Sequence, residues 1–432
     1  MLFSYKDIMD YVDENDVKFI RLVFFDIFGN MKNISIMDSE LSRALENGIA
    51  FDASEISGFM NIGESDLLLF PDPTTAEILP WRPQQSRVLR LFCDIRYPDG
   101  KPFEGDSRHI LKSAVKNAKK AGYNCEIGSE CEFYLFNSDE YGNPTLIPHD
   151  YGTFYDVAPV DKGENVRREI CLTLEEMGIA PQSSHHEKGP GQHEIVFRHS
   201  APVEAADHLM TFKNLVKTIA SINGLFASFM PRPLKNQSGN GLHMNISIYK
   251  GLNNVSNIEN ETAKQFIAGV LRRTGEMTLL LNPLTNSYAR FGQHQAPKYV
   301  SWSVQNRQQL IRIPSSSSSS DARIELRSPD PSCNPYLGYA LLISAGLEGI
   351  RDGLELVPPI NVTVKDNLSD VEPLPKTLEE AINLAENSKF LKDVLPESII
   401  DTYVEQKRLE WLDYKKAVDK DQYETEQYFS AI

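Results

Sequence analysis

The segment IGSECEFYLF, residues 127–136, predicts a β-strand that carries two acidic side chains on one of its faces. Side chains alternate between the two faces of a strand, so Glu130 and Glu132 point the same way, roughly 7 Å apart. The cysteine, phenylalanine and leucine at alternate positions make the opposite face apolar. A buried carboxylate pair is costly without a cation. The segment therefore predicts either a cation site on a central strand or an ordinary half-solvated strand.

Three other segments show the same kind of face. SHHEKGPGQHEIVF (184–197) has acidic residues on both sides of a Pro-Gly turn, and GLHMNISIY (241–249) and RIELR (323–327) alternate polar with apolar residues. Taken singly, the first segment is also explained by a solvated hairpin tip, the second by a structural histidine, and the third by an ion-pair ladder on a solvated strand. Their polar side chains are Glu187, Glu194, His185, His186 and His193 in the first segment, His243, Asn245 and Ser247 in the second, and Arg323, Glu325 and Arg327 in the third.

Taken together, these segments predict a site for hard cations and phosphate groups. Carboxylate oxygens select Mg²⁺ or Mn²⁺ over Zn²⁺, and Arg290, Arg307 and Arg312 add positive charge upstream of the last segment. The chain has no P-loop motif, no dinucleotide-binding glycine motif at a strand–helix junction, no GxSxG and no HExxH. Metals and arginines without a P-loop offer another route to phosphoryl transfer from ATP.

Composition narrows the class of protein further. The 432 residues are 41% hydrophobic and 24% charged, which predicts two or three globular domains. Against 44 Lys and Arg stand 60 Asp and Glu, and this net charge of −16 argues against nucleic acid as a partner. Five scattered cysteines without a CxxC pair favour a reducing cytoplasm. The chain has no signal peptide and no 18-residue apolar run, so we expect a cytoplasmic protein without a membrane partner.

The order of the expected elements predicts an α+β fold in two domains, residues 1–103 and 104–432. The boundary lies in YPDGKPFEGD (97–106), which is rich in Pro, Gly and Asp. The run Ser315–Ser320 predicts a flexible loop. We expect helices over 4–15, 39–48, 107–122, 164–178, 203–223, 261–280, 335–352 and in the tail from 376, and strands over 17–29, 31–37, 66–70, 75–80, 87–96, 124–136, 181–187, 192–198, 241–249 and 322–327.

In order along the chain, these segments and others resemble the motifs of type I glutamine synthetase, in the short form found in bacteria and archaea. The resemblance extends over nearly the whole length. The matching segments are FDASEISGF (51–59), ECE (130–132), HHE and GQHE (185–194), GNGLHMNIS (239–247), NPLTNSYARF (282–291), SWSVQNRQQLIRIP (301–314) and ARIELRSPDPSCNPY (322–336).

The resemblance implies a β-grasp-like N-terminal domain and a larger catalytic domain, whose antiparallel sheet is lined by metal ligands and flanked by helices. It implies ATP-dependent ligation of ammonia to the γ-carboxylate of L-glutamate through γ-glutamyl phosphate, which gives L-glutamine, ADP and phosphate. Two or more Mg²⁺ ions, or Mn²⁺ instead, would serve each site. Subunits of this family assemble as homododecamers of two stacked hexameric rings, with active sites between neighbours.

The resemblance also assigns roles by position in the motifs. One metal would be held by Glu132, Glu187 and Glu194, and the other, nearer the phosphates, by Glu130, His243 and Glu325. Glutamate would be bound by Arg290, Arg327 and the backbone of Gly239; the nucleotide by Ser247, Arg312 and Arg323; and the transferring phosphoryl group by Arg307. Asp52 of a neighbouring subunit would bind and deprotonate ammonium.

The chain departs from the family pattern at several positions. Where the family has Glu in an E-A-P triplet of its active-site flap, this chain has Gln295, which cannot attract ammonium as an anion does or act as a base. Glu55 is a hypothetical substitute for that anion, and unchanged ammonium kinetics in Glu55→Gln would refute this role. The glycine turn begins with Ser238, no lysine lies between Pro314 and Arg323, and no adenylylation-type tyrosine motif occurs near 365–376.

Gln295 leaves two alternatives to glutamine synthesis open. A γ-glutamyl-amine ligase would use a larger primary amine, which need not be attracted as ammonium. A catalytically weak, regulatory family member would show no ATP turnover. Against this alternative, the chain has a glutamate or a histidine at every predicted metal-ligand position.

Overall fold

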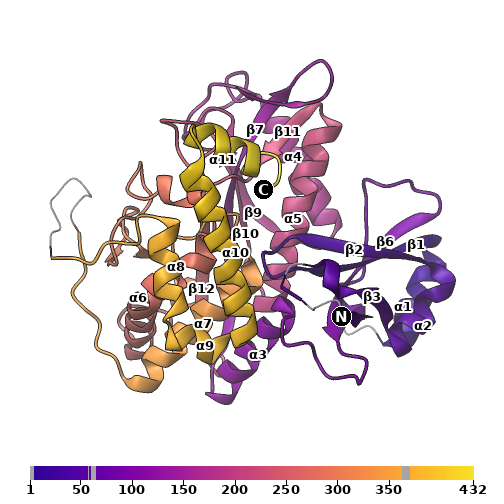
Figure 1. Ribbon diagram of the computed structural model, residues 1–432, viewed down its shortest axis with the longest axis horizontal. Coiled ribbons are helices and arrows are strands. Elements are labelled where there is room, and N and C mark those ends of the chain that lie inside the picture. Colours follow the sequence, from indigo (N-terminus) through magenta and orange to yellow (C-terminus); the bar gives the residue numbers. More distant parts are fainter. Residues whose placement is uncertain (1–3, 57, 60–64, 362–369) are drawn as a thin grey trace.

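The computed structural model describes residues 4–56, 58–59, 65–361 and 370–432, in two parts of unequal size (Figure 1). The elements of the smaller, N-terminal part are α1 (Tyr5–Glu14), β1 (Val17–Phe25), β2 (Met31–Met37), α2 (Leu41–Asn47), β3 (Ile49–Asp52), β4 (Asp66–Pro71), β5 (Glu77–Ile78) and β6 (Arg87–Arg96). The sheet order is β2-β1-β6-β4-β3, and β5 pairs with β6. This part has its own hydrophobic core, which runs from Ile8 to Phe103. The division between residues 103 and 104 stays a prediction.

A ten-stranded sheet forms the centre of the larger part. Its strands are β7 (Asn124–Ser138), β8 (Pro144–Pro148), β9 (Pro181–His186), β10 (Gln192–Phe197), β11 (Leu225–Ser228), β12 (Leu242–Lys250), β13 (Asn253–Asn254), β14 (Trp302–Val304), β15 (Ile311–Ile313) and β16 (Ile324–Leu326). The main order is β14-β15-β16-β12-β7-β10-β9, and β7 also pairs with β8 and β11. The sheet is antiparallel as expected, except that β14 and β15 run parallel.

Helices complete the larger part and bury the apolar face of β7. They are α3 (Ser107–Lys120), α4 (Glu164–Glu176), α5 (Pro202–Ile222), α6 (Glu261–Leu281), α7 (Pro335–Asp352), α8 (Leu378–Glu386), α9 (Lys389–Val394), α10 (Glu397–Lys416) and α11 (Lys420–Tyr428). Cys131, Phe133 and Leu135 lie fully buried in the core that these helices share with the sheet. The predicted apolar face of this strand is therefore confirmed.

Local chemistry explains where the predicted elements begin and end. The side chain of Asn334 caps α7 by accepting a hydrogen bond from the Tyr336 backbone N–H, and Gly353 ends this helix in the left-handed conformation. The strand expected over 17–29 ends at Phe25, because the Asp26 carboxylate accepts hydrogen bonds from two backbone N–H groups of the following turn. The strand expected over 75–80 shrinks to the two residues of β5.

The serine run is an exposed loop, and its predicted flexibility stays a prediction. Ser315–Ser320 is exposed, and a short 3₁₀ turn over Ser319–Asp321 closes it. Hydroxyl groups in the run bond locally, as in the contact of 2.7 Å from Ser317 to the Asp321 carboxylate. The stretch near 365–376, where no adenylylation motif was found, includes residues 365–369, which lie outside the described residues.

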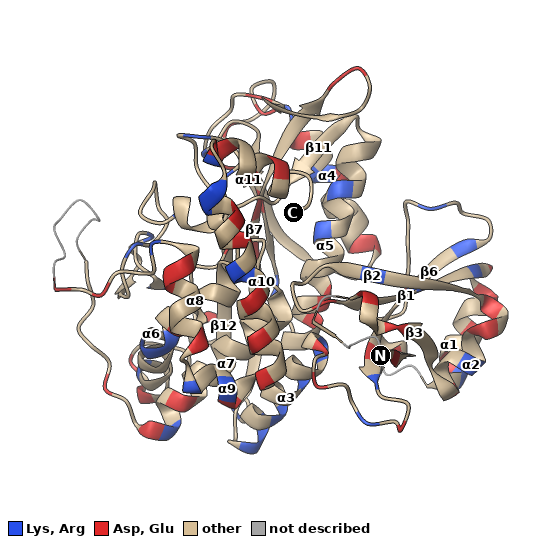
Figure 2. Cartoon of the chain, viewed as in Figure 1, with Lys and Arg blue, Asp and Glu red and all other residues tan. Residues whose placement is uncertain are grey.

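Charged residues of both signs are interspersed over the surface helices, as along α10 in Figure 2. Among the described residues, no helix has the length and the apolar character needed to cross a membrane.

Candidate active site

Strand register brings the acidic side chains of distant segments together. Glu132 of β7 lies directly opposite Glu194 of β10, and Glu130, on the same face, lies opposite His243 of β12. On the far side of β12, Glu325 of β16 continues the row. Adjacent strands are about 4.8 Å apart, so side chains from neighbouring strands lie within reach of a shared ion.

Glu130, Glu132, Glu194 and His243 line a cavity of about 520 Å³, and Glu325 is not among its lining residues. Glu325 is completely buried and forms ion pairs with Arg312 and Arg327, and Ser247 is buried with its hydroxyl bonded to the Ala322 carbonyl. The predicted site residues that line the cavity are Glu130, Glu132, Glu187, Glu194, Gly239, His243, Arg290, Gln295, Arg307, Arg312, Arg323 and Arg327.

The electrostatics of the cluster show a shortage of positive charge. Burial, together with the charge of Glu187, raises the pKa of Glu132 to about 8. Burial and the neighbouring carboxylates raise the pKa of Glu194 well above its usual range. Glu130 is different: although burial opposes it, the hydrogen bond from His243 lowers its pKa to about 2. A divalent cation would remove the repulsion between these carboxylates, so the donor set fits one.

Three groups of potential metal ligands occur in this cluster, and in each of them the ligand atoms lie within 4.8 Å of one another: Glu130–His243–Glu325, Glu132–Glu194–His243 and His185–Glu187–Glu194. The first group contains the three residues predicted for one metal. The second predicted set, Glu132–Glu187–Glu194, is divided between the other two groups, which share Glu194. His185 was not among the predicted ligands. Its Nε2 lies 3.0 Å from the Glu187 carboxylate, so it completes the third group. Among the described residues, a further group of this kind outside the predicted ligands is Asp150–Asp161–His186–His193.

Five arginines also line the cavity. The Arg290 guanidinium is buried and donates to the backbone carbonyls of Arg327 and Ser328, at 2.9 and 2.6 Å. Arg327 donates from Nε to the Arg307 carbonyl at 2.8 Å. Arg323 donates to Asn245 at 3.3 Å. Because backbone carbonyls hold the first two guanidinium groups, these side chains are fixed in place for an incoming anion.

The histidines next to the acidic hairpin have a structural role. His186 bonds to the Asp150 carboxylate at 2.8 Å and to the Glu187 carbonyl at 2.6 Å. His193 accepts a hydrogen bond from Arg167 at 2.8 Å. Both histidines are completely buried, and the Asp150 carboxylate also accepts from the backbone N–H of Gly191. This network fastens the tip of the hairpin that carries Glu187 and Glu194.

Asp52 is not among the residues that line the cavity. It ends β3 in the N-terminal part, is exposed, and accepts hydrogen bonds from the backbone N–H and the hydroxyl of Ser54. These bonds lower its pKa, so the carboxylate is charged at neutral pH. Within one chain, the structure does not bring this residue to the other site residues.

His199 is a cavity residue that sequence reasoning missed. It lies two residues after the end of β10, and its Nδ1 lies 3.2 Å from the Ser247 hydroxyl. Burial, and then the charge of Arg323, lower its pKa to about 4, so the imidazole is neutral. His199 is an odd number of residues after Glu194, so strand alternation predicts that the two side chains lie on opposite faces of the sheet. Because β10 ends at Phe197, this alternation no longer applies at His199.

Comparison with protein families gives two matches that together cover most of the chain. Residues 16–98 match the family described as "Glutamine synthetase, beta-Grasp domain", and residues 104–428 match "Glutamine synthetase, catalytic domain". The chain belongs to the glutamine synthetase family. The family uses ATP and divalent metals and acts on small-molecule substrates. The predicted family and the predicted α+β fold, with a β-grasp domain and a larger catalytic domain, are confirmed.

Curated relatives in this family are similar over nearly the whole chain. A glutamine synthetase from Clostridium saccharobutylicum is 45% identical, covering 96% of this chain and 97% of its own. Enzymes of the same name from Methanosarcina mazei and Staphylococcus aureus are 44% and 42% identical, with 98% or more of each chain covered. These relatives confirm the predicted enzyme class, an ATP-dependent carbon–nitrogen ligase. They support glutamine synthesis and do not favour the larger-amine alternative.

Solved structures of the same fold include two with lower sequence identity. "GmaS/ADP complex-Conformation 1" is 27% identical with a TM-score of 0.87, over 97% of this chain and 99% of that one. "Apo GmaS without ligand" is 28% identical with a TM-score of 0.88, over 98% and 99%.

Proposed function

We propose that this chain makes L-glutamine from L-glutamate, ammonia and ATP through γ-glutamyl phosphate, at the cavity that residues of the β9–β10 hairpin and the arginines line. The observation that carries the proposal is that buried and half-buried carboxylates of β7 and β10 line one cavity together with five arginines. A carboxylate is a poor electrophile, so the γ-oxygen must leave as phosphate, and this requires charge neutralisation at the transferring group.

The residues divide the work between cation, amino acid and nucleotide. Mg²⁺, or Mn²⁺ in its place, would be held by Glu130, His243 and Glu325 and by Glu132, Glu187 and Glu194, with His185 beside them, and would neutralise the phosphate charge of ATP. Arg290, Arg327 and the backbone of Gly239 would orient glutamate. Arg307 would stabilise the phosphoryl group during its transfer. The nucleotide would be bound by Ser247, Arg312 and Arg323.

We further propose that the working unit is an oligomer, a homododecamer of two hexameric rings, in the cytoplasm. The exposed position of Asp52, away from the cavity of its own chain, supports a site completed by a neighbouring subunit. The charged carboxylate of Asp52 would accept a proton from ammonium, which makes the nucleophile neutral.

A product assay tests this function. Purified protein with glutamate, ATP and Mg²⁺ is expected to release phosphate and form glutamine when ammonium is supplied. A panel of primary amines in place of ammonium is expected to give much less product. Formation of a γ-glutamyl amide from one amine, with no glutamine, would refute the proposal in favour of an amine ligase, and no turnover with any amine would favour a regulatory protein.

Gln295→Glu is expected to lower the KM for ammonium about 3- to 10-fold, because a carboxylate on the exposed flap adds attraction for a cation at the cavity mouth. The measurement is initial rate against ammonium concentration at fixed glutamate and ATP. Gln84→Glu, which adds the same charge to an exposed position outside the cavity, is the matched control. Equal KM values for Gln295→Glu and the control would contradict the expectation.

A further inference from the structure

A second cavity, of about 560 Å³, lies between the N-terminal part and the catalytic part. Among the described residues, none lines both this cavity and the active-site cavity. One wall comes from residues 72–77 and from β6, and the other from α3, α5 and the residues that precede β9. The proposed reaction makes no use of it.

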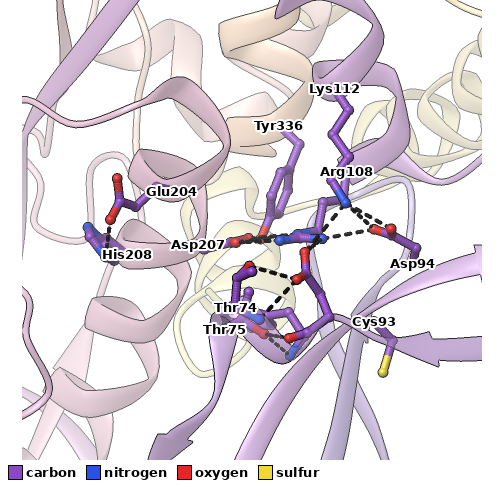
Figure 3. A network of polar contacts seen from close by, with 12 residues as sticks. Thr74, Thr75, Cys93, Asp94, Arg108, Lys112, Glu204, Asp207, His208 and Tyr336 are labelled. Carbon is purple, nitrogen blue, oxygen red and sulfur yellow. Dashed lines mark hydrogen bonds and ion pairs between the residues drawn. The ribbon is translucent and has the colours of Figure 1, made fainter. Parts of the chain in front are cut away.

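Arg108 of α3 lines this cavity and is fully paired. Its Nη1 contacts the carboxylates of Asp72 and Asp94 at 2.9 and 2.8 Å, and its Nη2 contacts Asp207 at 2.9 Å (Figure 3). Tyr336 donates a further hydrogen bond to Asp207, at 2.6 Å. Three carboxylates from three parts of the chain thus contact one guanidinium, so each of its nitrogen atoms already has an acidic partner.

Arg90 of β6 lines the same cavity and is not fully paired. Only 8% of it is exposed, and its guanidinium lies 4.0 Å above the centre of the Phe92 ring. One terminal nitrogen donates to the Thr211 hydroxyl. Its Nε–H finds no hydrogen-bond partner anywhere in the described part of the chain. A buried donor without an acceptor is costly, so this group calls for an acceptor that the protein does not supply.

Glu77 is the second unpaired charge at the cavity. It is the cross-strand partner of Arg90 in the β5–β6 register, yet within the described residues no hydrogen bond or ion pair joins the two side chains. Burial raises the pKa of Glu77 to about 7, as expected for a carboxylate that lacks a close cation. Two neighbouring charges of opposite sign therefore face the cavity separately.

We infer that this cavity binds a small zwitterion, whose carboxylate accepts from Arg90 and whose ammonium group donates to Glu77. The planar guanidinium matches a carboxylate in geometry and in charge. Met177, Ile179 and Val203 give the cavity an apolar wall beside these charges. The matching ligand class is an α-amino acid with a short aliphatic side chain, and the volume is ample for it.

Calorimetric titration of the assembled full-length protein with L-valine tests the inference. We expect one molecule of valine bound per chain. Isobutyrate and isobutylamine, which each keep only one of the two charges, are expected to bind at least tenfold more weakly. Glu77→Gln and Arg90→Met are each expected to weaken valine binding at least tenfold. Val203→Phe keeps both charges but puts a larger side chain into the apolar wall, and it should weaken binding even if Arg90→Met fails to fold.

Two control variants make the outcome decisive. Arg43→Met removes an exposed arginine from the same domain and should bind valine as the unmodified protein does. Arg290→Ala, in the active-site cavity, should also bind valine normally. Loss of binding in Arg290→Ala with retention in Glu77→Gln would assign valine to the active site and overturn the inference. So would the absence of any binding, or equal binding of isobutyrate and valine.

Discussion

Glu194→Gln is expected to lower activity on the order of 10²- to 10³-fold while making the metal-free protein more stable. Glu194 belongs to two of the three potential ligand groups in the active-site cluster, so its carboxylate is needed for cations on both sides. Without a cation, the same carboxylate is buried beside Glu130, Glu132 and Glu187, which is costly. Glutamine keeps the shape and removes the charge. The measurements are glutamine formation with Mg²⁺ and the Tm in EDTA.

Glu355→Gln is the matched control for this experiment. Glu355 is exposed and lies outside the cavity, so neither its activity nor its Tm in EDTA should change. A metal-free Glu194→Gln protein that melts below the unmodified protein would show that the carboxylate stabilises the fold without a cation, contrary to expectation.

Arg108→Met is expected to destabilise the protein by about 3–5 kcal/mol. The substitution leaves Asp72, Asp94 and Asp207 near one another with one cation fewer, at the junction between the two domains (Figure 3). Removing one partner of a buried ion pair costs far more than the pair contributes, because the remaining charges stay out of water. The measurement is the urea midpoint of the full-length protein.

The control for Arg108 is an arginine with exposed partners. Arg351 pairs with Asp352 at 2.9 Å, but 71% of its side chain is exposed, so Arg351→Met should cost about 0–1 kcal/mol. Equal losses for the two variants would mean that the buried network does not hold the domains together.

The stability of the metal-free protein is expected to depend on pH, because folding raises the pKa values of buried carboxyl groups. A carboxyl group whose pKa is raised on folding stabilises the folded state fully below its ordinary pKa, and this contribution is lost as pH rises through the folded value. For Glu132 that range extends from about 4.5 to about 8, and Glu194 extends it further. Urea midpoints in EDTA should therefore fall from pH 5 to pH 8, and excess Mg²⁺ should reverse the fall. A midpoint independent of pH in EDTA would contradict this.

The sequence predicted the long elements well, because their periodicity extends over many residues. The expected helices over 164–178, 203–223 and 335–352 correspond to α4, α5 and α7 within two residues at each end. Short strands such as β11 and β14 escaped prediction, because three or four residues show no alternation and depend on their neighbours in the sheet.

The candidate site was predictable to the extent that strand alternation controls it. Glu130 and His243 share a face in their strands, and the register then places them opposite each other. Two features were not predictable: Glu194 is shared between two ligand groups, and His185 joins one of them. Both depend on side-chain rotamers and on the conformation of the hairpin tip, which sequence periodicity does not determine. His199 lies beyond a strand end, where alternation stops.

The pairing of β7 with both β10 and β12 constrains how a chain of this kind can change its length over evolutionary time. A single-residue deletion early in β7 (Asn124–Ser138) would turn every later side chain of the strand to the other face of the sheet. Glu132 would then point into the hydrophobic core, and Cys131 would point into the active-site cavity. A substitution in this strand changes one side chain, whereas a register shift of one residue removes all the acidic side chains from the active-site face. Heritable length variation is thus restricted to connections such as Ser315–Ser320, where added residues cost little more than chain entropy.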